Sequence, residues 1–370
     1  MSPGSGAPAR PAAPGAGAGR LASVDALRGL TVAAMLLVNN PGDWGHVYAP
    51  LLHAEWHGFT PTDLIFPLFL FIVGVSISLA LGRQLERGVA PAALLPPVAA
   101  RAARIVGLGL LLHLCAWWAF DLDFYRPMGV LQRIGLCYFA AAACALYVPA
   151  RQQWVAWGAL LLGYWALLVA GGSFDPWTNV ASRVDTAILG PHAYRFDPAI
   201  GLGHDPEGFV STLGALATTV LGLRAGDLLR RGALKPLLWL AVALLLLGLL
   251  WRPWLPFNKA LWTPSYVVWS GGLSIVLLAG CHWAIDRHGM PAVGRAFGVN
   301  AIAAYAGSAF MLYLLAGLGG LQPLYQHGFA DWMTPRFGPW VPSLAYALAF
   351  VAFWWGVVRW LDARGIHFKV

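Results

Sequence analysis

The segment HAEWHGFTPTD, residues 53–63, places two histidines, a glutamate and an aspartate between two strongly apolar runs. If this loop folds back, the carboxylate of Asp63 can hold one imidazole nitrogen of His53 while the other nitrogen faces a reactant. A base or nucleophile of an acyl transfer needs that arrangement. Two plainer interpretations stay open. The polar residues could form a wet loop at a membrane surface, and Asp63 could cap a helix that starts near Pro61.

Two adjacent amides, Asn39 and Asn40, end the apolar run that precedes this loop. A side-chain amide can bind a carbonyl oxygen or a developing oxyanion. Both amides would lie at about the same depth as His53 and Asp63, so the four side chains could meet in one patch. The alternative is that Asn39 and Asn40 only end a helix before Pro41.

The elements that must position these residues are membrane-spanning helices. The chain has 370 residues, of which 59% are hydrophobic and 11% charged, and its mean hydropathy is +0.64. It is far more apolar than a soluble domain. Apolar stretches long enough to cross the hydrocarbon layer predict one all-α polytopic membrane domain of about ten helices. The predicted spans are 24–40, 61–81, 100–120, 127–148, 152–171, 208–226, 235–251, 264–284, 293–316 and 340–361.

The distribution of charge predicts the orientation of the chain. With the N-terminus inside, 17 of the 24 lysines and arginines fall on the cytoplasmic side, so the positive-inside rule predicts both termini in the cytoplasm. The net charge of +8 is then mostly a topology signal and needs no nucleic acid partner. Residues 1–20, rich in Gly, Pro and Ala, are predicted to be a disordered tail before the membrane domain of residues 21–370. The four cysteines lack metal-ligand spacing, and no metal site is expected.

Successive blocks of the sequence resemble the heparan-α-glucosaminide N-acetyltransferase family. They resemble above all its bacterial members, some of which are labelled as N-acetylglucosamine uptake proteins. The patterns D-x-x-R-G and H-A-x-W-x-G-x-x-x-x-D-L-x-F-P are specific together, and the resemblance runs in order from about residue 21 to the C-terminus. Its blocks are SVDALRGLTVAAMLLVNNPG, HAEWHGFTPTDLIFPLFLFIVGVS, RPMGVLQRIGLCYF, DPEGFVSTLGALATTVLGLRAG, FNKALWTPSYVV and FGVNAIAAY.

The resemblance implies a multi-pass enzyme of the cytoplasmic (inner) membrane, with a homodimer as its assembly. Such an enzyme takes acetyl-CoA from the cytosol and acetylates the amino group of a glucosamine-type sugar on the external side, without a metal. It further implies that His53 is the active-site histidine and that Asn39 and Asp63 match the asparagine and aspartate of the family motif. His57 stands where the animal enzyme has asparagine. Direct transfer and a two-step route through an acetyl-histidine both fit the sequence.

The remaining candidate residues divide by side of the membrane. Candidates for binding the acceptor sugar are polar groups near the external side: Asn40, His57, Gln132, Arg133, Asp205, Glu207, Asn258 and Lys259. Two of these assignments have structural rivals, since Arg133 could pair with Asp121 or Asp123 and the acidic pair could cap a helix. Candidates for the CoA phosphates are arginines at cytoplasmic helix ends, each of which could instead be a topology signal: Arg28, Arg101, Arg104, Arg224 and Arg295.

Two other functions remain open from the sequence. One is an amino-sugar transporter, although the paired repeats with broken helices that are common in transporters are not evident here. The other is an acyltransferase that moves a different acyl group or acts on another cell-envelope glycan.

Overall fold

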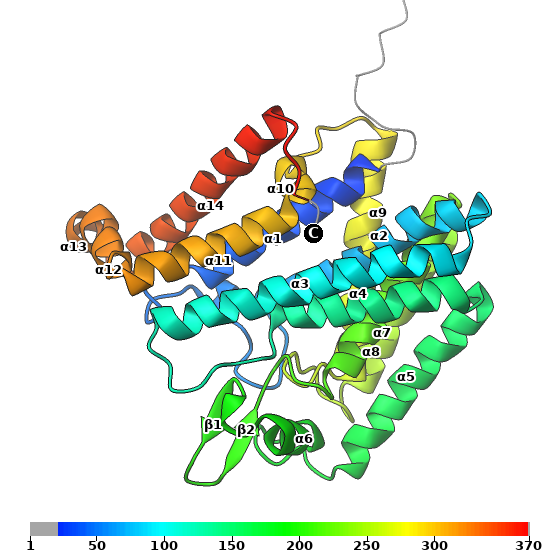
Figure 1. The fold of residues 1–370 in the computed structure, drawn as a ribbon, viewed down its shortest axis with the longest axis horizontal. Helices are drawn as coiled ribbons and strands as arrows, with labels where there is room; N and C mark the ends of the chain where they lie inside the picture. The colour runs from blue at the N-terminus through cyan, green and yellow to red at the C-terminus, as the bar shows by residue number, and fades with distance from the viewer. Residues whose placement is uncertain (1–20, 369–370) are drawn as a thin grey trace, which may run out of the picture.

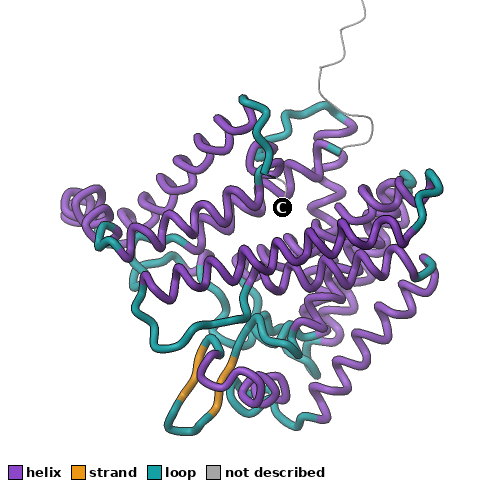
Figure 2. Tube along the Cα trace, in the orientation of Figure 1, coloured by secondary structure: helices purple, strands orange, loops and turns teal. Residues whose placement is uncertain are grey.

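Helices make up most of the computed structural model, which describes residues 21–368, and the small sheet is one antiparallel hairpin (Figures 1 and 2). The predicted tail, residues 1–20, lies outside the described residues. The first half of the chain forms α1 (Ala22–Asn39), α2 (Ile65–Glu86), α3 (Pro91–Ala119), α4 (Val130–Tyr147), α5 (Ala150–Ala170), α6 (Val180–Leu189), β1 (Arg195–Asp197) and β2 (Leu202–His204). The second half forms α7 (Thr212–Arg230), α8 (Leu234–Trp251), α9 (Pro264–Cys281), α10 (Arg295–Val299), α11 (Ala301–Gly317), α12 (Leu321–Tyr325), α13 (Asp331–Phe337) and α14 (Trp340–Ala363).

The predicted spans all correspond to helices, with two differences. Within residues 21–368, eight helices are long and apolar enough to cross a membrane, or nine if α11 and the bent segment Leu321–Phe337 form one span. The predicted span 208–226 is α7, which begins at Thr212 and is not among the eight. The predicted span 293–316 is divided at Asn300 into α10 and α11. The chain is an all-α, multi-pass membrane protein.

The centre of the bundle explains why α7 is less apolar than its neighbours. It lies against α2, with Thr218 and Thr219 fully buried. A Cβ atom on Gly74 would lie 2.0 Å from the Thr219 carbonyl oxygen, and one on Gly222 would lie 2.0 Å from the Phe71 carbonyl oxygen. The two backbones therefore approach as closely as small residues allow. A helix surrounded by protein can keep polar side chains because it meets little lipid.

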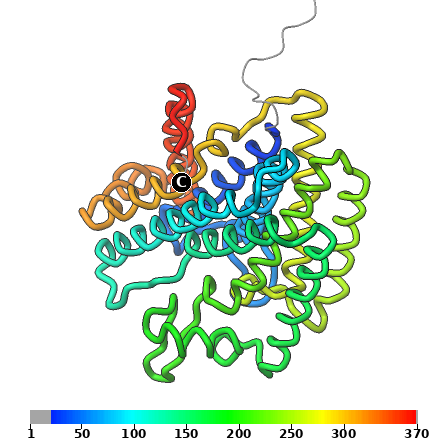
Figure 3. The backbone as a smooth tube through the Cα atoms, turned by 45° about the vertical axis from the view of Figure 1, so that its right-hand side comes forward, coloured from blue at the N-terminus to red at the C-terminus, as the bar shows by residue number. Residues whose placement is uncertain are grey.

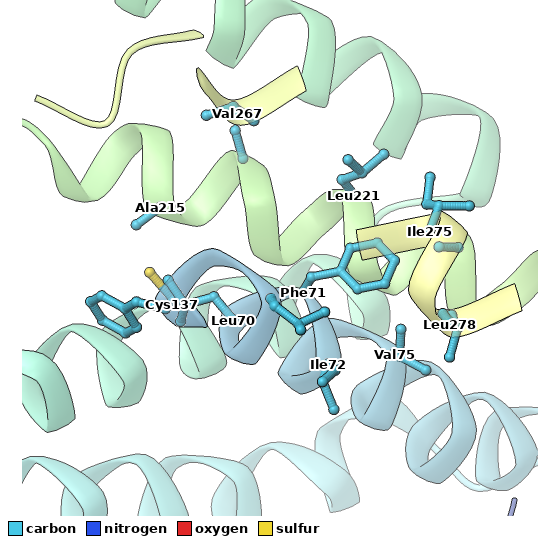
Figure 4. Close-up of a cluster of buried hydrophobic side chains, with 14 of the residues drawn as sticks. Leu70, Phe71, Ile72, Val75, Cys137, Ala215, Leu221, Val267, Ile275 and Leu278 are labelled. Atoms are coloured by element: carbon cyan, nitrogen blue, oxygen red, sulfur yellow. The ribbon is translucent and has the colours of Figure 1, made fainter. Parts of the chain in front are cut away.

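Apolar side chains from α2, α4, α7 and α9 fill the core around this contact. In Figure 4, Phe71 of α2 points toward Leu221 of α7 and Ile275 of α9, and Leu70 lies beside Cys137 of α4. The helix α1 lies between two groups of helices, since it contacts α2 and α9 as well as α10, α11 and α14. It is therefore the element that joins the core to the helices at the C-terminal end of the chain.

The loops gather at two opposite ends of the bundle. At one end, both ends of the described chain meet the same region, because Ser23 donates to Asp286 and the Phe368 backbone N–H donates to Asn300. At the other end, the α1–α2 loop is tied to two distant loops. The Trp56 indole donates to the Phe174 carbonyl, and the Gly58 N–H donates to the Phe257 carbonyl. The β-hairpin and α6 project at this second end (Figures 1 and 3).

Candidate active site

The α1–α2 loop brings His53 and Asp63 together. Their atoms Nδ1 and Oδ1 are 2.7 Å apart, and the Asp63 side chain is 1% exposed whereas that of His53 is 45% exposed. A carboxylate can only accept a hydrogen bond, so its contact with Nδ1 places the imidazole proton on that nitrogen. The lone pair of a neutral His53 is then on Nε2, at the more accessible side of the ring.

Asp63 also caps the helix, so the two interpretations of this residue are both realised. Its Oδ2 atom accepts from the backbone N–H groups of Ala54 and Thr60 at 3.1 and 2.9 Å, and the Thr60 hydroxyl accepts from the Asp63 N–H. The other carboxylate oxygen of Asp63, Oδ1, faces His53 Nδ1. The Tyr266 hydroxyl donates to the Asp63 carbonyl oxygen at 2.6 Å. The carboxylate is thus fixed by the turn that starts α2, which orients the imidazole.

The loop between α8 and α9 supplies the neighbours of both histidines. Lys259 Nζ lies 3.3 Å from His53 Nε2, and Asn258 Nδ2 lies 3.3 Å from His57 Nδ1. Asn258 is fully buried and its Oδ1 accepts from the Leu261 N–H at 2.8 Å. Burial lowers the pKa of His57, which favours its neutral form.

The two amides at the end of α1 do not join this cluster. Asn40 is buried and its side chain donates to the Leu36 carbonyl at 2.7 Å, so it closes the last turn of the helix. Asn39 is exposed, and within residues 21–368 its side chain makes no hydrogen bond with His53 or Asp63. The structure therefore supports the helix-ending interpretation of Asn40 and leaves the predicted role of Asn39 without a contact.

Asp205 and Glu207 form a buried ion cluster with Arg126. Arg126 donates to both oxygens of Asp205, and its Nη2 lies 2.6 Å from Glu207 Oε2. Burial alone would raise the pKa of Glu207, but the charges of Arg126, Arg133 and Lys259 lower it to about 2. Asp205 is therefore paired with Arg126 inside the protein. The sequence had instead suggested Asp205 as a contact of the acceptor sugar.

Arg133 and Gln132 are buried beside this cluster and have structural partners. Arg133 donates to the Gly208 carbonyl and the Ser211 hydroxyl, at the turn before α7, and does not pair with Asp121 or Asp123 as the alternative supposed. Gln132 donates to the Pro127 carbonyl at 3.1 Å. Both side chains hold the loops at this end of the bundle in place. Among the described residues, neither makes a hydrogen bond with His53.

A cavity of about 550 Å³ runs from the opposite end of the bundle toward this site. Arg83, Arg101 and His367 line it at that opposite end, and Met35 and Phe69 line its inner part. From Arg83 to Phe69 is fourteen residues of α2, or about 21 Å, and Asp63 is about 9 Å further along. Its volume is within the usual range for a small-molecule site. Charged side chains line the cavity at the end that holds Arg83, and apolar side chains line its inner part.

The arginines predicted to bind phosphate separate into two groups. Arg28 and Arg101 line this cavity. Arg28 donates to Asp25, Ser76 and the Gly298 carbonyl, while the Arg101 guanidinium lies 5.2 Å from the Tyr138 ring centroid. The other three lie elsewhere: Arg104 is exposed, Arg224 lines a second cavity of about 490 Å³ and bonds Asp227, and Arg295 bonds Asp362.

Reasoning from the sequence missed several residues that the structure brings to these sites. Arg126 was not among the candidate residues, although it begins the RPMGVLQRIGLCYF block. Arg83 and His367 at the cavity had no signal beyond their predicted cytoplasmic position. Tyr266, which holds the Asp63 carbonyl, looks like any aromatic residue of an apolar helix.

Known proteins resemble this chain over most of its length. Residues 20–187 match the family model described as the catalytic part of heparan-alpha-glucosaminide N-acetyltransferase. The chain is 29% identical to that enzyme of Homo sapiens over 352 residues, 78% of this chain and 52% of that protein. It is 28% identical to that of Mus musculus over 354 residues, with coverages of 78% and 53%. The chain thus spans about half the length of these curated relatives. These matches confirm the resemblance carried by the sequence motifs: the chain is similar to the heparan-α-glucosaminide N-acetyltransferases over most of its length.

Proposed function

We propose that the protein is a transmembrane acetyltransferase of the cytoplasmic membrane. It moves an acetyl group from cytosolic acetyl-CoA to the amino group of a glucosamine-type sugar on the external side. The observation that carries the proposal is the combination of an accessible histidine on a buried aspartate at one end of the bundle with a long cavity entered from the other end. A transporter would need neither an oriented base nor a separate donor cavity.

The cavity is the proposed donor site. Its apolar walls suit the pantetheine arm, and Arg83, Arg101 and Arg28 suit the phosphates because guanidinium groups bind phosphate oxygens in a planar, bidentate way. The inner end lies within two helical turns of Asp63 along α2. This supports an orientation in which the nucleotide stays in the cytosol while the thioester approaches His53.

His53 is the proposed general base. The amino group of the sugar attacks the thioester carbonyl carbon, and Nε2 takes the proton that the nitrogen loses. Asp63 holds the imidazole in the correct tautomer and stabilises the imidazolium that forms. His57 and Asn258, joined at 3.3 Å beside this pair, are the proposed contacts of the sugar hydroxyls.

The test is product formation by purified protein given acetyl-labelled CoA and glucosamine. The unaltered chain is expected to make labelled N-acetylglucosamine, and His53→Ala is expected to make none. His46→Ala is the matched control, because His46 Nδ1 also lies 2.7 Å from a carboxylate, Asp43, in the same loop, where both side chains are exposed. Glucosamine that crosses vesicles unmodified, with no product from the unaltered chain, would establish the transporter instead.

A further inference from the structure

Lys259 occupies the one nitrogen of His53 that Asp63 leaves open. Its Nζ lies 3.3 Å from Nε2, while Nδ1 is held by the carboxylate. The lysine is half-buried, in a loop that is fixed on both sides. The backbone N–H of Asn258 donates to the Thr263 hydroxyl, and the Phe257 carbonyl accepts from Gly58. The α1–α2 loop and the α8–α9 loop are thus hydrogen-bonded to each other, and the contact between Lys259 and His53 lies between them.

The protonation states follow from the partners. Because Asp63 accepts from Nδ1, the imidazole presents a lone pair at Nε2, and Lys259 donates to it. An amine that uses Nε2 as its base must take the place of Lys259 there. The thioester oxygen that gains charge lies two bonds from the attacking nitrogen, so the displaced ammonium is within reach of it.

We propose that Lys259 is a catalytic residue of the acetyl transfer, which leaves Nε2 when the acceptor amine arrives and stabilises the oxyanion of the tetrahedral intermediate. This inference rests on the proposed acetyltransferase function. In the step, the amine nitrogen bonds to the carbonyl carbon and the C=O electron pair moves to oxygen, while Nε2 accepts the N–H proton. Collapse re-forms C=O and breaks C–S, and the CoA thiolate takes the proton from Nε2. Lys259 keeps its own protons throughout.

The surroundings of Lys259 lower the pKa of its ammonium group. Burial lowers the pKa of Lys259 from its ordinary value of 10.5. The charged and titratable groups that face it are Asp63 and Glu207, which favour the ammonium, Arg126 and Arg133, which oppose it, and His53. The activity should therefore fall as the pH rises through the lowered pKa of this lysine.

The rival role for Lys259 is to bind sugar hydroxyls, and kinetics separate the two. Lys259→Met is expected to lower kcat by about 100- to 1,000-fold, the usual effect of losing one oxyanion donor, with the acceptor KM within about threefold of the unaltered value. Lys259→Arg keeps the charge and is expected to restore part of kcat and to lose the alkaline decline, since a guanidinium does not titrate there. A sugar-binding role predicts the opposite: a raised KM and an unchanged kcat.

The experiment is a set of kcat and KM measurements from pH 6 to about 10 on the unaltered chain, the two Lys259 variants and Arg252→Met. Arg252 is an exposed cation of the same loop and serves as the matched control for charge. Melting temperatures and acetyl-CoA binding check that each variant folds. An unaltered kcat in a folded Lys259→Met, or an alkaline decline that persists in Lys259→Arg, would overturn the inference. No product from the unaltered chain would instead refute the acetyltransferase function itself.

Discussion

Replacing Asp63 by asparagine tests how the structure orients its base. The two carboxylate oxygens have different surroundings, since Oδ2 accepts from the backbone N–H groups of Ala54 and Thr60, whereas Oδ1 faces only His53 Nδ1. The amide NH₂ of an asparagine cannot face the two backbone donors, so it must point at Nδ1. A donor at Nδ1 moves the imidazole proton to Nε2.

The expected result is a folded protein with the wrong histidine tautomer. An Nε2–H group cannot accept the proton of the acceptor amine, and it also opposes the N–H donors of Lys259, 3.3 Å away. General-base catalysis contributes about 10² to 10⁴ in rate, so kcat for Asp63→Asn should fall by that factor, or about 3–5 kcal/mol in activation free energy. The oxygen kept in place of Oδ2 preserves the helix cap, so the cost in stability should be small.

The assay is labelled N-acetylglucosamine formation, with the melting temperature measured on the same preparation. Asp43→Asn is the control, because Asp43 holds His46 in a similar pair that is exposed. A folded Asp63→Asn protein within tenfold of the unaltered kcat would show that His53 does not act as a base oriented by this carboxylate. Full loss of folding would show that the cap, rather than the tautomer, is the main role of Asp63.

Three further predictions concern the donor cavity and the buried charges. Arg101→Ala should raise the acetyl-CoA KM about tenfold, the loss expected for one charge-assisted contact, whereas Arg104→Ala, outside the cavity, should not. Arg126→Met leaves Glu207 buried without its cation, so thermal or denaturant unfolding should show a loss of about 3–5 kcal/mol at pH 7. Burial raises the pKa of Asp185 to about 7, so its ionisation opposes folding as the pH rises toward that value. Asp185→Asn should therefore raise the melting temperature at pH 8 more than at pH 4; an equal effect at both would contradict this.

The fold was predictable from the sequence because membrane helices carry a strong local signal. Stretches of apolar residues locate the helices, but they do not distinguish a lipid-facing helix from one enclosed by protein. The helix α7 shows the limit, since Arg224 and Asp227 are buried among other helices and bond each other at 2.9 Å. The division at Asn300 is another case, because it lies beside a close contact between distant segments. A Cβ atom on Gly298 would lie 1.8 Å from the Asp25 carbonyl oxygen.

The site was only partly predictable because most of its contacts join distant loops. His53 and Asp63 are ten residues apart in one loop, so their pairing could be proposed from the sequence. The loop holds a second pair, His46 and Asp43, with the same 2.7 Å separation. Burial distinguishes them, with Asp63 1% and Asp43 39% exposed. Lys259, which is 206 positions from His53, had no local signal for its contact.

The helix α1 connects the cavity to the loop that carries His53. Asp25, Arg28, Val32 and Met35 recur at helical spacing and all line the proposed donor cavity. One face of α1 therefore follows the cavity from the end that holds the phosphate-binding candidates to the inner end. The chain then leaves this helix directly into the loop that carries His53. A single stretch of sequence thus forms a wall of the proposed donor site and leads to the proposed base, so substitutions along this face should affect donor binding more than acceptor binding.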